Sequence, residues 1–198
     1  KERARLRMLW ELAGEAGLWR AAGGLLRPHP RNARRWLAAP PEEQASLLAR
    51  AWLTGMRWND LWQVPTLSPE ATGWLNNPHL PRRLLLGLLA QLPPQTWWAL
   101  DSLPPAIKAA NPDFQRTAGD YESWYIKERG SDQFLMGFAH WDQVEGALLR
   151  FLTSGPLAWL GLVELGQDQA GRPAFRASPA GLAFAREQRY PAPTGAAP

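Results

Sequence analysis

The sequence predicts a mainly α-helical protein with small β-hairpins, organised as tandem winged-helix (α+β) units. The clearest observation is the stretch from Gly161 to Arg186, GLVELGQDQAGRPAFRASPAGLAFAR, whose alternating apolar residues predict two strands around a glycine-containing turn. Ser178 can accept a hydrogen bond from the first turn of the next helix, and Pro179 suits the first helical position. A helix that leads into a β-hairpin is the outline of a winged helix.

The second observation is an internal repeat near the start of the chain. A strand at 18–20, a turn at 21–24 and a return strand at 25–27 precede a helix over 31–38, and Leu18 lies 162 − 18 = 144 residues before Leu162. In this helix we expect Trp36 and Leu37 to face inward and the arginines outward. The repeat predicts two winged units, the first without the helices that should precede its wing. Chance likeness remains the alternative, because a hairpin followed by a helix is a common local pattern.

Helical spacing and capping residues predict the remaining elements in chain order. We expect helices over 3–16, 40–52, 80–92 and 102–110, the last capped by Asp101; short helical segments at 58–62 and 68–75; a strand at 96–100; and a helix from 142 to 153 opened by a capping box of Asp142 and Glu145. The last of these helices, which precedes the second wing, is mostly apolar, with Glu145 and Arg150 expected to be exposed. It therefore offers few polar side chains to base edges.

Asn76–Pro78 is the best candidate for a boundary between two halves. We expect residues 1–75 to form a basic winged-helix-like unit with a helical linker. Residues 76–190 would form a C-terminal winged-helix domain, with an aromatic-rich insertion at 111–139 that packs on it. Residues 191–198 are predicted to be a disordered tail. Because the chain begins with Lys1, we expect it to be part of a larger protein.

Composition limits the classes of protein that are possible. The chain has no cysteine, which excludes disulfides and thiolate metal sites and favours a reducing compartment, so we expect a cytoplasmic location. No apolar run reaches the ~18 residues of a membrane span, and no secretory signal is present, so we expect no membrane partner. Most of the 12 tryptophans should pack between short helices.

Positive charge is concentrated in the first fifth of the chain. Residues 1–36 hold nine Lys or Arg and three acids, a net +6, whereas the remainder holds 13 basic and 15 acidic residues, a net −2. The arginines on or just after the first wing could meet phosphates on either side of a groove. These candidate nucleic-acid-binding residues are Arg20, Arg27, Arg31, Arg34 and Arg35. The alternative is that they form a solvated face or dock on a partner protein.

Signals for catalysis are weak. The chain has no phosphate-binding Gly-rich motif, no His-Glu-x-x-His and no Gly-x-Ser-x-Gly, so we expect no catalytic residue, cofactor or metal. An acidic segment that includes Asp113 and Glu122, with Lys127 nearby, faintly suggests a divalent-metal nuclease. The spacing fails, however, because Tyr125 stands where the acid-x-Lys step needs an acid.

Four segments carry a resemblance to a known family. Trp58–Trp62, Asp120–Tyr125, and above all Gly155–Val163 with Phe175–Gly181 resemble bacterial winged-helix proteins related to the N-terminal region of XPB-type DNA helicases. The resemblance implies tandem winged-helix modules within a longer polypeptide and a link to DNA transactions. Helicase activity is not implied, because this chain carries no ATPase motif, and the resemblance transfers no catalytic residue.

The sequence therefore predicts a non-enzymatic winged-helix module that binds double-stranded DNA through its basic first unit. A protein-interaction or structural module that holds flanking domains together is the alternative. A metal-dependent nuclease is a remote third possibility.

Overall fold

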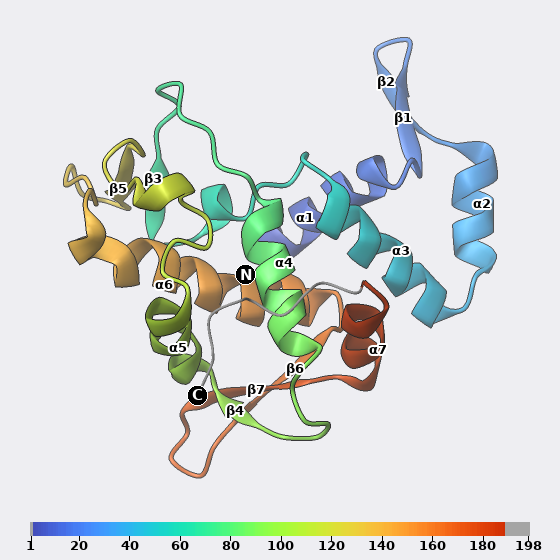
Figure 1. Ribbon diagram of the computed structural model, residues 1–198. Helices are drawn as coiled ribbons and strands as arrows, with labels where there is room; N and C mark the ends of the chain where they lie inside the picture. The colour runs from blue at the N-terminus through green and yellow to red at the C-terminus, as the bar shows by residue number, and fades with distance from the viewer. Residues whose placement is uncertain (1, 189–198) are drawn as a thin grey trace.

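The computed structural model describes residues 2–188, which form a mixed α/β protein with small antiparallel sheets (Figure 1). Within this range the helices are α1 (Glu2–Glu15), α2 (Pro30–Ala38), α3 (Pro41–Thr54), α4 (His79–Leu89), α5 (Leu103–Ala110), α6 (Trp141–Leu152) and α7 (Pro179–Glu187). The strands are β1 (Trp19–Ala22), β2 (Leu25–Pro28), β3 (Leu67–Pro69), β4 (Trp98–Ala99), β5 (Ile126–Glu128), β6 (Val163–Gln167) and β7 (Pro173–Ala177). None of the helices in residues 2–188 has the length and apolarity needed to cross a membrane. The expected tail at 191–198, with residues 189 and 190, lies outside the described residues.

The C-terminal half is built around a three-stranded antiparallel sheet in the order β4-β7-β6. The chain passes through α4, β4, α5 and α6 before it reaches the β6–β7 hairpin, and β4 then pairs with the free edge of β7. The predicted strands and helix between 161 and 186 are confirmed. Ser178 caps α7 by accepting from the Gly181 amide at 2.8 Å, and its hydroxyl donates to the Gly161 carbonyl at 2.6 Å.

The segment between α5 and α6 ties the two halves of the chain together. Its strand β5 pairs with β3, and the Arg129 side chain donates to the carbonyls of Pro65 and Leu67, both at 2.6 Å. Trp124 from this segment continues a stack of rings that begins at Trp62 and passes through Trp74. The expected packing of the aromatic-rich insertion is therefore confirmed, whereas the helix expected over 68–75 is wrong because its first residues belong to β3.

One hydrophobic cluster contains residues from both sides of Asn76–Pro78. Met8 and Trp52 contribute from the first half, and Leu86 and Leu148 from the second. Buried beside this cluster, the Arg82 guanidinium pairs with Asp60 at 2.7 Å. The second oxygen of Asp60 accepts from the indoles of two tryptophans, Trp52 and Trp58. Both oxygens of this buried carboxylate therefore have hydrogen-bond partners.

Two capping predictions are wrong, because the side chains make longer-range ion pairs instead. Asp142 lies within α6, and Glu145 is buried against Arg116 and not exposed. Asp101 does not cap α5; its carboxylate pairs with Arg150 at 2.9 Å. These pairings hold α6 from two sides, so most of this helix is covered by the protein.

Candidate nucleic-acid interface

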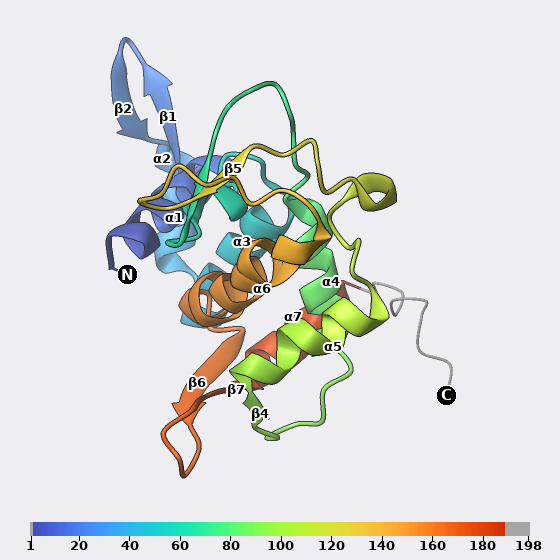
Figure 2. The ribbon, with the colours of Figure 1, turned by 90° about the vertical axis from the view of Figure 1, so that its left-hand side faces the viewer.

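The β1–β2 hairpin stands away from the rest of the protein in both ribbon views (Figures 1 and 2). Gly23 and Gly24 form its turn with φ angles of 60° and 73°, the left-handed conformation that a two-residue hairpin turn with matching twist requires. A Cβ atom added at either glycine would meet no atom within 4 Å. The turn is therefore open to solvent, at the tip of a projecting hairpin.

The register of the hairpin separates its side chains into two faces. Arg20 lies opposite Arg27, and Ala22 lies opposite Leu25, so these four side chains share one face by alternation. The opposite face carries Trp19 at its base. The Trp19 ring stacks on Trp10 of α1 at 4.9 Å between centroids, and its indole donates to the Trp10 carbonyl at 3.0 Å. One face thus attaches the hairpin to the body and leaves the arginine face outward.

Arg20 and Arg27 are directly opposed like charges. Both are exposed, and neither forms an ion pair with any residue in the described part of the chain. Like charges at directly opposite positions of an antiparallel pair destabilise the pairing, and a bound anion removes that penalty. The two arginines therefore place unneutralised positive charge side by side on the hairpin.

Helix α2 extends the positive surface from the base of the hairpin. His29 caps its first turn, and the Asn32 side chain donates to the Gly17 carbonyl at 2.9 Å. None of its residues is buried, and Leu37, which was expected to face inward, is 69% exposed. The expectation failed because α2 rests on α3 through few residues, chiefly Trp36, whose indole donates to the Gln44 carbonyl at 3.2 Å.

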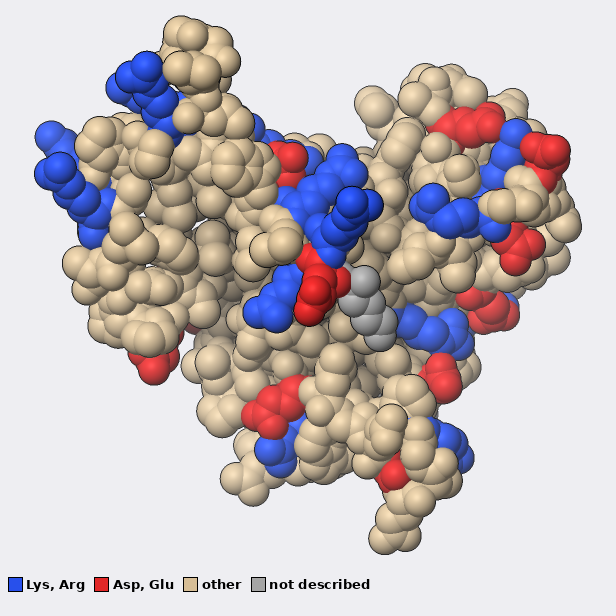
Figure 3. Space-filling model, turned by 180° about the vertical axis from the view of Figure 1, so that it is seen from behind, with Lys and Arg blue, Asp and Glu red and all other residues tan. Residues whose placement is uncertain are grey.

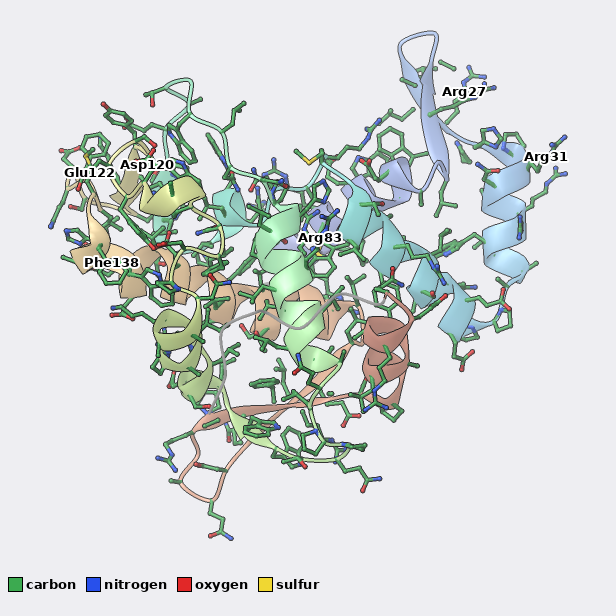
Figure 4. The ribbon with its side chains drawn as sticks, in the orientation of Figure 1. Arg27, Arg31, Arg83, Asp120, Glu122 and Phe138 are labelled. Atoms are coloured by element: carbon green, nitrogen blue, oxygen red, sulfur yellow. The ribbon has the colours of Figure 1, made fainter. Side chains whose placement is uncertain are left out.

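Arg31, Arg34 and Arg35 occupy adjacent positions on α2, since residues three and four apart lie on one side of a helix. All three are exposed and form no ion pair within residues 2–188. In Figure 4 the labelled side chains of Arg27 and Arg31 lie at the outer edge of the molecule, away from the core. The structure therefore places the predicted arginines on three adjoining elements, β1, β2 and α2, here called the basic lobe (residues 19–38).

Several other surface arginines differ from these because an acidic side chain neutralises each of them. Arg172 pairs with Asp168 at 2.7 Å on the β6–β7 hairpin, and Arg176 pairs with Glu164 at 2.6 Å beside it. Arg50 pairs with Glu187 at 2.9 Å. On the face seen in Figure 3, Lys and Arg stand without acidic neighbours on the hairpin, whereas both signs alternate over the middle of the molecule. Free positive charge thus accumulates on the first hairpin and not on the second.

The exposed leucines of the basic lobe were missed at the level of sequence. Leu25 and Leu26, in the predicted return strand at the hairpin tip, are 58% and 52% exposed. Outside the lobe, Arg3, Arg5 and Arg7 on α1, which belong to the basic first fifth of the sequence, are also exposed without ion pairs in the described range. The Gly23-Gly24 turn was the available signal for a projecting tip, because two consecutive glycines leave no side chain to pack.

The acidic segment forms local contacts. Asp113 accepts from the Tyr121 hydroxyl at 2.6 Å. Hydrogen bonds from the Ser123 side chain and from the amides of Glu122 and Ser123 lower the pKa of Asp120. Lys127 pairs with Glu70 at 2.8 Å and with Asp132 at 3.8 Å, and it forms no ion pair with Asp113 or Glu122 within the described residues. Within residues 2–188, no group of three or more His, Cys, Asp or Glu side chains is placed to hold a metal ion.

In comparisons with known proteins, no family model, curated protein or solved structure matches this chain.

Proposed function

We propose that this chain is a non-enzymatic DNA-binding module that grips the phosphates of duplex DNA through its basic lobe. The observation that carries the proposal is the set of exposed arginines without acidic partners on β1, β2 and α2. Arginine presents a planar fork of donors that matches phosphate oxygens, and such contacts supply most of the affinity in non-specific DNA binding.

We further propose that residues 79–187 form a winged-helix unit. Its support is the element order of helix, strand, helix, helix and hairpin, together with the pairing of β4 on the outer edge of β7. The first half would be a reduced relative, because its helix–hairpin–helix order is similar but its sheet has two strands. The tandem arrangement expected from the sequence is retained in this weaker form.

Helix α6 occupies the position from which a winged helix normally enters the major groove. Here Trp141, Val144 and Leu148 are buried on one side of it, and Glu145 is buried beneath the insertion. Its exposed Gln143 accepts from His140, and Arg150 is paired with Asp101. The second unit therefore presents few free groups to a base edge, so the proposed contact with DNA lies on the basic lobe.

Phosphate binding without base readout predicts the effect of substituting these arginines. Replacing both Arg20 and Arg27 by Ala should weaken duplex binding by roughly tenfold per lost contact at about 0.1 M salt, to a similar degree on unrelated sequences. Fluorescence anisotropy with two labelled duplexes measures this. Arg172→Ala is the matched control, since it removes an exposed hairpin arginine that is already paired with Asp168. Equal affinities for wild type, the double variant and the control would contradict the proposal.

A protein-interaction module is the second candidate function, favoured by a different observation. An apolar cavity of about 470 Å³ opens between α4, α5 and β7, lined by residues that include Leu84, Leu88, Trp98, Leu103 and Phe175. Apolar pockets of this size commonly receive ligands or partner side chains. This alternative predicts that the arginine substitutions leave duplex affinity unchanged.

A further inference from the structure

The hairpin tip combines two properties that phosphate binding alone does not require. Leu25 and Leu26 are more than half exposed, and they follow directly after the Gly23-Gly24 turn. Both ribbon views place this tip at the most projecting point of the basic lobe (Figures 1 and 2). Large aliphatic side chains at such a position cost free energy in water, which a ligand that buries them would recover.

The arginines lie behind one of these leucines on the same face. Leu25 is two residues from Arg27 along β2, so their Cα atoms are separated by roughly 7 Å, and Arg20 stands opposite Arg27. A tip that enters a groove therefore brings this cation pair close to the groove walls. The walls of a DNA groove are phosphate backbones, and the minor groove is about 6 Å wide and 7.5 Å deep.

The depth of the minor groove and the apolar side chains of the tip together indicate what the tip would contact. The tip is narrow because its turn is Gly-Gly, with no side chain at either position. An apolar side chain delivered to the floor of the minor groove meets the stacked edges of base pairs. Leucine is among the residues that proteins insert there, between base steps, to kink the duplex.

We propose that the hairpin tip inserts Leu25 into the minor groove of duplex DNA as a wedge that kinks it, while Arg20 and Arg27 clamp the flanking phosphates. This inference rests on the proposed function and adds deformation of the DNA to it. Pyrimidine–purine steps such as TA unstack most easily, whereas A-tracts resist deformation, so the wedge would favour duplexes that contain TA steps.

The experiment uses resonance energy transfer between dyes at the two ends of a duplex of roughly 20 base pairs. One duplex has a central TA step and the other a central A-tract. Saturating wild-type protein should shorten the end-to-end distance of the TA duplex, in line with a kink of roughly 20–90°, and should change the A-tract duplex less. Leu25→Ala should abolish most of the change at saturation, whereas Leu165→Ala, an exposed leucine on the other hairpin, should retain it.

The outcomes separate the wedge from phosphate binding. If wild-type protein binds with a strong salt dependence but leaves the end-to-end distance unchanged, the wedge is refuted and the proposed function stands. The same holds if Leu25→Ala bends the TA duplex as strongly as wild type does, and the exposed tip would then belong to a protein contact. If wild type binds neither duplex, both the wedge and the proposed function are refuted.

Discussion

Glu145 is buried, although the sequence pattern of its helix predicts an exposed side chain. Its side chain is 1% exposed; one carboxylate oxygen accepts from Arg116 at 2.7 Å and from Gln115 at 3.1 Å, and the other has no hydrogen-bond partner within the described residues. Burial raises the pKa of Glu145, and the Arg116 charge opposes that rise only in part. A carboxyl group so placed favours its protonated form relative to the unfolded chain.

This raised pKa predicts a pH dependence of stability. Above the ordinary value of 4.5, the unfolded chain loses the proton of Glu145 before the folded protein does. The free energy of unfolding should therefore fall as the pH rises from about 4.5 through the higher pKa of the folded state. Because Gln does not titrate, wild type should lose stability relative to Glu145→Gln across this interval, as measured by urea unfolding of both proteins at each pH. A gain of wild type over the variant with rising pH would mean that Arg116 outweighs burial.

At the scale of an element, the β1–β2 hairpin depends on its turn and not on the core. Gly24 has a φ of 73°, a conformation that costs other residues about 1 kcal/mol. Gly24→Ala should therefore speed hydrogen exchange of the β1 and β2 amides roughly fivefold and leave the thermal midpoint of the protein almost unchanged. Exchange followed by mass spectrometry resolves this peptide.

Gly171→Ala is the matched control for that experiment, since Gly171 has a φ of 75° and an open surrounding at the other hairpin. It should speed exchange in β6 and β7 without affecting β1 and β2. A large drop in the thermal midpoint of Gly24→Ala would show instead that the first hairpin is part of the cooperative core.

Local patterns predicted local elements well. The Gly161–Arg186 stretch was recognisable because its turn, strands and helix cap are each fixed by residues only a few positions apart. The pairing of β3 with β5 was not predictable in this way, because it joins residues about sixty positions apart through backbone hydrogen bonds. Segment 68–75 accordingly suggested a capped helix, while the structure uses its first residues as a strand.

The candidate site was predictable in part for the same reason. Charge counting found the arginines of the basic lobe, because the excess of basic over acidic residues in the first fifth of the chain is visible in the sequence. It could not distinguish Arg27 from Arg116 or Arg82, two arginines whose acidic partners lie far away in the chain. The exposure of Leu25 also depends on the hairpin standing off the body, which only the fold determines.

At the scale of the whole molecule, the arginines of the basic lobe lie apart from the hydrophobic core. The hydrophobic cluster runs through α1, α3, α4, α6 and the β6–β7 hairpin, whereas α2 contributes no buried residue. The contacts that hold the basic lobe include Trp19 on Trp10, Asn32 on Gly17 and Trp36 on Gln44. The His29 amide also donates to the Leu18 carbonyl, and Arg57 lies over the Trp19 ring. A lobe attached in this way can be altered by substitution with little effect on the rest of the fold.

The salt dependence of duplex binding tests the central claim most directly. If the five arginines of the basic lobe each neutralise one phosphate, the logarithm of the binding constant should fall with the logarithm of salt concentration at a slope of about −4 to −5. Replacing Arg31, Arg34 and Arg35 by Ala should flatten that slope by about one for each lost contact. A slope near zero, or a slope that the triple variant shares with wild type, would contradict DNA binding through the basic lobe.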